Sequence, residues 1–236
     1  MKDFLRDICP PIIWRKAHEF RSKNRFPLAS KNTKGQDLEV YWNEEMAKIL
    51  EIWGEGNAWN EIQYLMACRS GKVLDIACGT GKTIELLKGY PDIEVYGCDI
   101  SDLLLKKALE RGISATRLML EDATKMSYSD QYFDWGYSIG SLEHFTDDGI
   151  DKFLSETKRV VKYATFHMIP VSRTEKDEGW IKTLQSYHNN STSWWLDKCR
   201  KIYPIVITID SSWCDPISKG IWLICINRQP KMNDEC

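Results

Sequence analysis

Short apolar runs alternate with amphipathic segments through most of the chain after Gly71. Seven of the runs have the length and composition of β-strands: residues 73–77, 94–98, 116–120, 133–139, 163–169, 205–209 and 221–226. Between them, apolar positions recur at helical spacing over residues 83–88, 102–110, 148–161 and 193–202. Alternation of strands with helices is typical of βαβ units. The pattern therefore predicts a doubly wound α/β fold around a mostly parallel, seven-stranded sheet.

The first 66 residues carry a helical pattern instead. Aromatic residues punctuate residues 37–66, and a turn signal at Gly54 and Gly56 divides that segment. Before Gly35, apolar and basic residues mix in an amphipathic leader, which either rests on an anionic membrane surface or a partner enzyme through residues 1–30, or covers the domain. We expect a helical leader and lid over residues 1–66, and a main domain over residues 67–230 with a substrate insertion around residues 170–192.

Composition narrows the class of protein. The net charge of −2 over 236 residues provides no positive field that would gather nucleic acid, so no nucleic-acid partner is expected. The eight cysteines lack the C-x-x-C spacing of a zinc site, and no metal is expected. Apolar stretches fall short of the ~20 residues that a membrane span needs. With no secretory leader pattern, we expect a cytoplasmic protein, either free or peripheral on the inner face of the membrane.

The sharpest motif is V-L-D-I-A-C-G-T-G-K over residues 73–82, where an apolar strand runs into a glycine-rich turn and a helix start. Gly79 and Gly81 allow positive φ and close approach of a ligand, and the first amides of the following helix point toward it. Asp75 stands near the strand end, where its carboxylate could bind an ammonium or order the loop. Asp99 follows at the tip of the second strand, where an acid can accept both ribose hydroxyls of an adenosine ligand.

Three nucleotide-like ligands are candidates for binding at this turn. A P-loop requires a glycine at the position of Ile76, which disfavours ATP. A dinucleotide fingerprint requires a glycine or alanine at the position of Ile84, so NAD stays open but is less favoured. The sequence of this turn agrees best with a methyl donor built on adenosine.

Four motifs in order, L-D-I-A-C-G-T-G, C-D-I-S, E-D-A-T and F-D-W-G-Y-S-I-G-S-L-E-H-F, resemble those of class I S-adenosylmethionine-dependent methyltransferases. The resemblance covers about residues 72–163 and implies a Rossmann-like fold with S-adenosylmethionine as cofactor. It implies these positions: Asp75, Ala77, Gly79 and Gly81 around the methionine portion, Asp99 and Ile100 at the ribose and adenine, Asp122 and Ala123 at the adenine edge, Ser138 and Gly140 on the side from which the methyl group leaves, and Tyr41 in a lid.

The chain departs from the family pattern after the long helix, where R-V-V-K-Y-A-T replaces the frequent proline and glycine turn, so the substrate side is atypical. In the leader, I-C-P-P-I-I-W-R-K is similar to the leaders of methyltransferases found with bacterial surface-polysaccharide enzymes. This second similarity implies a carbohydrate or phosphorylated metabolite as acceptor.

Methyl transfer requires alignment, exclusion of water and removal of one proton. His144, just past the fourth strand, is the first candidate for the base, although it could only cap or pack the next helix. Glu143 could orient His144 or bind an amine, or be a solvated helix-start carboxylate. His167 reaches the crevice if it lies near its strand's end, or else is a hydrogen-bonded core histidine. Arg173 and Lys176 of the insertion could grip a phosphate or carboxylate, or be solvated charges.

The sequence therefore predicts a methyltransferase acting on an oxygen or nitrogen of a small molecule, preferably a carbohydrate or phosphorylated metabolite. Two alternatives stay open. One is an N-methyltransferase of a small amine, in which Glu143 holds the ammonium. The other is a catalytically silent subunit that binds S-adenosylmethionine and supports a partner, because binding is not turnover.

Overall fold

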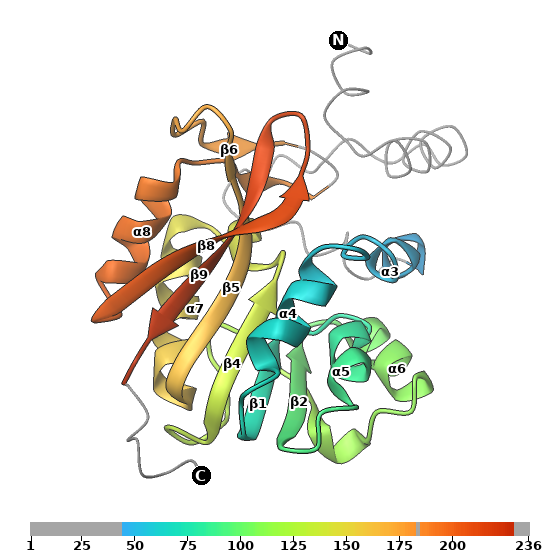
Figure 1. The fold of residues 1–236 in the computed structure, drawn as a ribbon. Helices are drawn as coiled ribbons and strands as arrows, with labels where there is room; N and C mark the ends of the chain where they lie inside the picture. The colour runs from blue at the N-terminus through green and yellow to red at the C-terminus, as the bar shows by residue number, and fades with distance from the viewer. Residues whose placement is uncertain (1–43, 183–184, 229–236) are drawn as a thin grey trace.

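The computed structural model describes residues 44–182 and 185–228 (Figure 1). Within these residues, two helices precede the sheet, α3 (Glu44–Leu50) and α4 (Ala58–Met66), separated by a turn that includes Gly54 and Gly56. The elements that follow are β1 (Gly71–Ile76), α5 (Lys82–Leu87), β2 (Ile93–Asp99), α6 (Asp102–Glu110), the 3₁₀ turn η2 (Ala115–Arg117), β3 (Leu118–Leu120), β4 (Phe133–Ile139), the 3₁₀ turn η3 (Leu142–His144), α7 (Asp147–Val160), β5 (Val161–Ser172), β6 (Trp180–Ile181), β7 (Tyr187–His188), α8 (Thr192–Arg200), β8 (Ile205–Cys214) and β9 (Ser218–Ile226).

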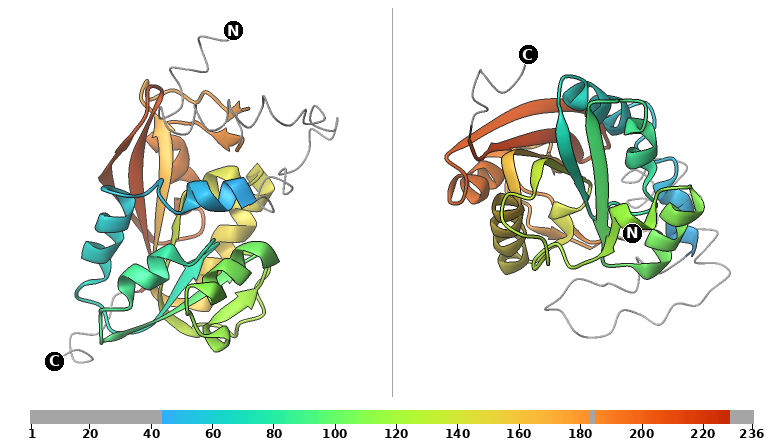
Figure 2. Two further views of the ribbon diagram at one scale, coloured as in Figure 1. Left: turned by 90° about the vertical axis from the view of Figure 1, so that its right-hand side faces the viewer. Right: turned by 90° about the horizontal axis from the view of Figure 1, so that it is seen from below.

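Seven of the strands form one sheet in the order β3-β2-β1-β4-β5-β9-β8. The strands β1 to β5 pair in parallel, whereas β9 runs antiparallel to both of its neighbours. Helices α4, α5 and α6 cover one face and α7 and α8 the other (Figure 2), with an apolar cluster on each side. The predicted doubly wound, mostly parallel α/β sheet is confirmed.

The structure corrects several element boundaries. Of the predicted strand 116–120, only Leu118–Leu120 is extended, because η2 takes up the residues before it. Strand β5 continues to Ser172 because β9 pairs with it along a ladder that ends at Ser172 and Ser218. Inside the predicted insertion, β6 and β7 form a small hairpin that the sequence did not reveal. No helix within the described ranges is long and apolar enough to span a membrane.

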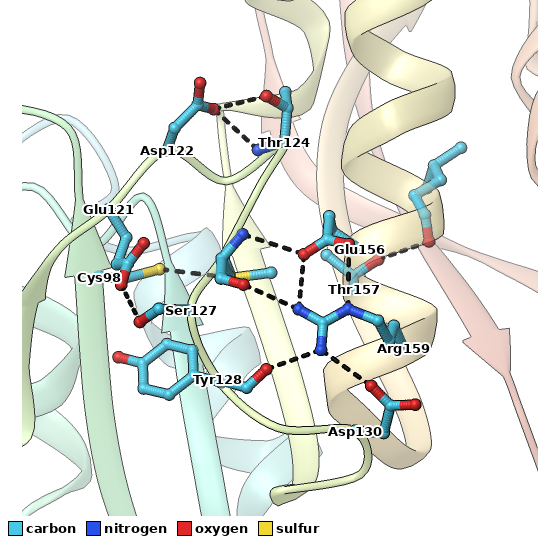
Figure 3. A network of polar contacts seen from close by, with 12 residues as sticks. Cys98, Glu121, Asp122, Thr124, Ser127, Tyr128, Asp130, Glu156, Thr157 and Arg159 are labelled. Carbon is cyan, nitrogen blue, oxygen red and sulfur yellow. Dashed lines mark hydrogen bonds and ion pairs between the residues drawn. The ribbon is translucent and has the colours of Figure 1, made fainter.

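A single arginine of α7 fixes the loop that leads into β4 (Figure 3). Arg159 donates two hydrogen bonds to the Glu156 carboxylate, at 3.0 and 2.8 Å. It also donates to the carbonyls of Met126 and Tyr128, at 2.8 and 2.6 Å, and to Asp130 at 2.9 Å. These bonds hold the segment that directly follows the E-D-A-T motif, so Arg159 positions that motif relative to the sheet.

We expect Arg159→Lys to lower the free energy of unfolding by ~1–3 kcal/mol, because an ammonium cannot reproduce the forked set of charge-assisted bonds. Urea unfolding followed by circular dichroism measures this loss. Arg117→Lys is the matched control, since Arg117 is exposed and has one ion pair, to Glu94 at 3.0 Å, so the change should cost less than ~0.5 kcal/mol. Equal losses in the two variants would contradict the role given to Arg159.

Candidate active site

The turn after β1 uses left-handed backbone at three of five consecutive positions. Ala77, Gly79 and Gly81 have φ of +59°, +54° and +71°. Glycine adopts this region at little cost, which explains two of the three residues, whereas Ala77 carries some strain. A Cβ on Gly81 would also lie 2.3 Å from Cδ1 of Ile113. The missing side chain of Gly81 therefore lets the start of α5 pack against Ile113.

Asp99, at the end of β2, is joined to the glycine turn. One of its carboxylate oxygens accepts from the Gly79 amide at 2.8 Å, and the other accepts from the Ser101 amide at 2.9 Å. The side chain is only 6% exposed, and burial raises the pKa of Asp99 although these amide hydrogen bonds oppose the rise. Each oxygen keeps a lone pair, so this carboxylate suits a ligand that donates two hydroxyl hydrogen bonds.

Asp75 turns toward the start of α5, where it accepts a hydrogen bond from the hydroxyl of Thr83. Burial raises the pKa of Asp75 to about 7. Of the two roles considered for this residue, the contact with Thr83 corresponds to ordering of the loop.

The described part of the N-terminal segment lies against Gly79 and Gly140. Cδ1 of Leu50 is 3.5 Å from the Cβ position of Gly79, and the Trp53 ring is 3.0 Å from that of Gly140, which has φ of +63°. This places α3 at the end of the molecule where β1 passes into α5 (Figure 1). Arg111 links the segment after α3 to the glycine turn. It forms an ion pair with Glu51 and donates a hydrogen bond to the Thr80 carbonyl at 3.0 Å.

Glu143 has a buried carboxyl beside Gly140. Its Oε1 lies 3.6 Å from the Cβ position of Gly140 and 3.7 Å from Nε2 of His144. The residue is 4% exposed, and Oε2 has no hydrogen-bond partner among the described residues. Burial raises the pKa of Glu143 to about 8, so the carboxyl keeps its proton at neutral pH.

His144, next to Glu143, is neutral at physiological pH. Its Nδ1 lies 2.8 Å from the Ser186 carbonyl, which can only accept, so Nδ1 carries the proton in this bond. Burial lowers the pKa of His144 to about 4. A group with so low a pKa is a weak base at neutral pH.

His167 is fully buried on the α7 side of the sheet, where its ring meets Phe153 edge to face. Nδ1 is hydrogen bonded to the Ser138 hydroxyl and Nε2 to the Thr165 hydroxyl, both at 2.9 Å. Burial lowers the pKa of His167 to about 3. Both ring nitrogens are thus engaged, and the Ser138 hydroxyl turns into the core.

Other predicted site residues are more dispersed. Ile100 is 40% exposed, Ala123 is buried, and the exposed Asp122 accepts bonds from the amide and hydroxyl of Thr124 (Figure 3). Tyr41 lies outside the described residues.

Arg173 lies beyond the end of β5, five residues past Met168, whose carbonyl accepts from the Gly140 amide. At the strand rise per residue this is roughly 16 Å from Gly140. Arg173 donates instead to the Asp215 carbonyl at 3.0 Å. The structure therefore does not bring Arg173 next to Glu143, and Lys176 is an exposed residue of the turn that follows β5.

Sequence reasoning did not single out Leu50, Trp53 and Arg111. The turn signal at Gly54 was the available clue for Trp53, since Trp53 directly precedes it in the turn between α3 and α4. Across residues 44–182 and 185–228, no group of three or more candidate metal ligands converges.

Comparison with known proteins identifies the domain. Residues 73–164 match the family described as "Methyltransferase domain". The tRNA (carboxymethyluridine(34)-5-O)-methyltransferase of Arabidopsis thaliana is 33% identical over 122 residues, which are 51% of this chain and 29% of that protein. The ubiquinone/menaquinone biosynthesis C-methyltransferase of Burkholderia mallei is 32% identical over 144 residues, covering 56% and 57% of the two chains.

A solved structure, the 1,6-didemethyltoxoflavin-N1-methyltransferase of Burkholderia thailandensis with S-adenosylhomocysteine bound, superposes with a TM-score of 0.60. It is 14% identical and covers 87% of this chain and 93% of its own, a likeness of fold. The chain spans 29% and 57% of the two curated relatives it matches above. The bare glycine turn and the carboxylate of Asp99 fit an adenosine cofactor. Residues 73–164 are therefore a methyltransferase domain of Rossmann-like fold whose cofactor is S-adenosylmethionine.

Proposed function

We propose that the protein transfers a methyl group from S-adenosylmethionine to an oxygen or nitrogen of a small molecule, and that Glu143 takes the proton of the acceptor. The observation that carries this proposal is the buried carboxyl of Glu143 beside Gly140, whose Oε2 has no hydrogen-bond partner among the described residues. Glu143 is preferred to His144 as the base because the pKa of Glu143 is near neutrality, whereas that of His144 is about 4.

The other residues of the site then have proposed roles that agree with their positions. Gly79 and Gly81 offer backbone to the methionine portion, with Asp75 ordering their loop, and Asp99 accepts the ribose hydroxyls. Ile100, Asp122 and Ala123 border the adenine, and Leu50 and Trp53 exclude water. When bound, S-adenosylmethionine supplies an electrophilic methyl group. His167 is a positioning residue that fixes Ser138 at the end of β4.

The acceptor class is also a proposal. The relatives are named as O- and C-methyltransferases and the structural neighbour as an N-methyltransferase, so the acceptor atom has to be found by experiment. A carbohydrate or phosphorylated acceptor rests on the leader similarity, and a grip by Arg173 and Lys176 stays a prediction. Contact of residues 1–30 with a membrane or partner also stays a prediction, for it falls outside the described residues.

The test is release of S-adenosylhomocysteine from S-adenosylmethionine in the presence of separate pools of sugar nucleotides, phosphorylated amines, simple amines and tRNA. We expect turnover with a small-molecule pool and none with tRNA, given the net charge of −2. Turnover with tRNA alone would contradict the small-molecule assignment. No turnover with any pool, by protein that binds the cofactor, would favour the silent subunit.

A further inference from the structure

The Glu143 carboxyl combines burial with an oxygen, Oε2, that has no hydrogen-bond partner among the described residues. It is positioned by η3, which follows directly on β4 and Gly140. Trp53 also lies against Gly140, with its ring 3.0 Å from the same Gly140 Cβ position that Glu143 approaches. The carboxyl is therefore buried next to Gly140, close to the segment that follows α3.

Little charge surrounds this carboxyl. The pKa of Glu143 is raised by burial, and the opposing effect is a hydrogen bond to its own backbone. The elements packed against η3 are β5, β7 and α7. These elements carry the titratable groups His167, Tyr187, His188 and Asp147, and His144 is the neighbour of Glu143 on η3 itself. Burial lowers the pKa of all three histidines, so they are neutral at pH 7 and do not compensate a carboxylate.

A buried carboxyl in such a setting responds strongly to a cation placed beside it, because an opposite charge at close range favours the ionised form. S-adenosylmethionine carries a fixed positive charge on its sulfonium sulfur. S-adenosylhomocysteine has a neutral thioether at the same place and otherwise the same groups. The two molecules therefore differ mainly at the sulfur atom, which is positively charged in S-adenosylmethionine and neutral in S-adenosylhomocysteine.

We propose that Glu143 is the counter-ion that distinguishes the sulfonium of S-adenosylmethionine from the thioether of S-adenosylhomocysteine, losing its proton when the former binds and keeping it when the latter binds. This inference rests on the proposed function, because the resemblance to methyltransferases is what assigns Gly140 to the methyl-leaving side. It assigns Glu143 a role in binding in addition to its role as base.

The charges balance through one turnover. The acceptor oxygen or nitrogen forms its bond to the methyl carbon while the carbon–sulfur bond breaks and leaves its electron pair on sulfur. The acceptor's proton passes to the Glu143 carboxylate. A sulfonium and a carboxylate thus become a thioether and a carboxylic acid, and no unpaired charge is buried before or after transfer.

Isothermal titration calorimetry at pH 7 in phosphate and in Tris counts the protons released on binding. With a pKa of about 8, Glu143 is protonated in the free protein. We expect roughly 0.9 more proton to be released with S-adenosylmethionine than with S-adenosylhomocysteine. From pH 6 to 7 the ratio of the two affinities should shift about tenfold in favour of S-adenosylmethionine.

In Glu143→Gln the difference in proton release should vanish, and the affinity for S-adenosylmethionine should fall ~10-fold or more relative to that for S-adenosylhomocysteine. Retained binding of S-adenosylhomocysteine shows that this variant is folded. Glu110→Gln, which removes a half-exposed carboxylate of α6, is the matched control and should behave as wild type.

The outcomes separate the two proposals. Equal proton release with the two ligands in the wild type, or a difference that persists in Glu143→Gln, overturns the counter-ion role and leaves the methyltransferase proposal standing. A folded wild-type protein that binds neither ligand overturns the proposed function itself.

Discussion

Glu143→Gln is expected to lower kcat by ~10²-fold or more while changing the affinity for S-adenosylhomocysteine less than about twofold. Glutamine matches the shape of the side chain but cannot accept a proton. Steady-state kinetics with the acceptor found by screening, together with titration of S-adenosylhomocysteine, give both quantities. A loss of kcat without a loss of product affinity is what a group acting on the acceptor proton should produce.

The matched control is His144→Asn, which keeps a donor toward the Ser186 carbonyl and removes the imidazole. Its kcat should fall less than about tenfold, because the histidine's low pKa makes it a poor base. A large loss in His144→Asn with normal turnover in Glu143→Gln would reverse the assignment of the base.

If Glu143 is the base, kcat/KM should depend on pH. In the free protein the pKa of Glu143 is raised to about 8, so the ionised, proton-accepting form increases as pH rises through that value. We expect kcat/KM for S-adenosylmethionine to rise with pH up to about 8 and then level off, and this rise should be absent from Glu143→Gln. The bound sulfonium should move the corresponding rise in kcat to lower pH.

Asp99→Asn is expected to weaken binding of S-adenosylhomocysteine by ~10²-fold. Two backbone amides, of Gly79 and Ser101, donate to the two oxygens of Asp99, and an asparagine would turn an NH₂ group toward one of them. The variant also loses the negative charge that ribose hydroxyls would meet. Calorimetric titration measures the loss, and thermal unfolding separates it from a loss of fold.

Asp102→Asn provides the control for this change, since the exposed Asp102 bonds to the Leu103 amide at the start of α6 and does not reach the glycine turn. It should bind S-adenosylhomocysteine like the wild type. Equal losses of affinity in Asp99→Asn and Asp102→Asn would show that Asp99 has no special place in the cofactor site.

The features that depend on local order along the chain could be predicted. A strand, a glycine turn and a helix in direct succession bring Gly79 toward Asp99, because parallel neighbouring strands end at the same edge of a sheet. Helix α6 begins and ends where its polar and apolar spacing indicated, with Ser101 capping it. The spacing of apolar and polar residues was sufficient to predict these elements.

The ionisation of the catalytic candidates could not be predicted in this way. His144 was the first candidate because its ordinary pKa suits a base, but its neutrality depends on burial and on the carbonyl of Ser186, 42 positions away in the sequence. The contact of Trp53 with Gly140 likewise joins segments far apart in the chain. Burial by distant segments is a property of the tertiary fold, and no local pattern encodes it.

Calorimetric titration of the purified, folded protein with S-adenosylhomocysteine tests directly whether the glycine turn and Asp99 bind the cofactor. We expect one molecule to bind per chain with a dissociation constant in the micromolar range, which is a binding free energy of about −8 kcal/mol. Absence of binding by protein that unfolds cooperatively would contradict the claim that the turn from Asp75 to Gly81 and the carboxylate of Asp99 form a site for S-adenosylmethionine.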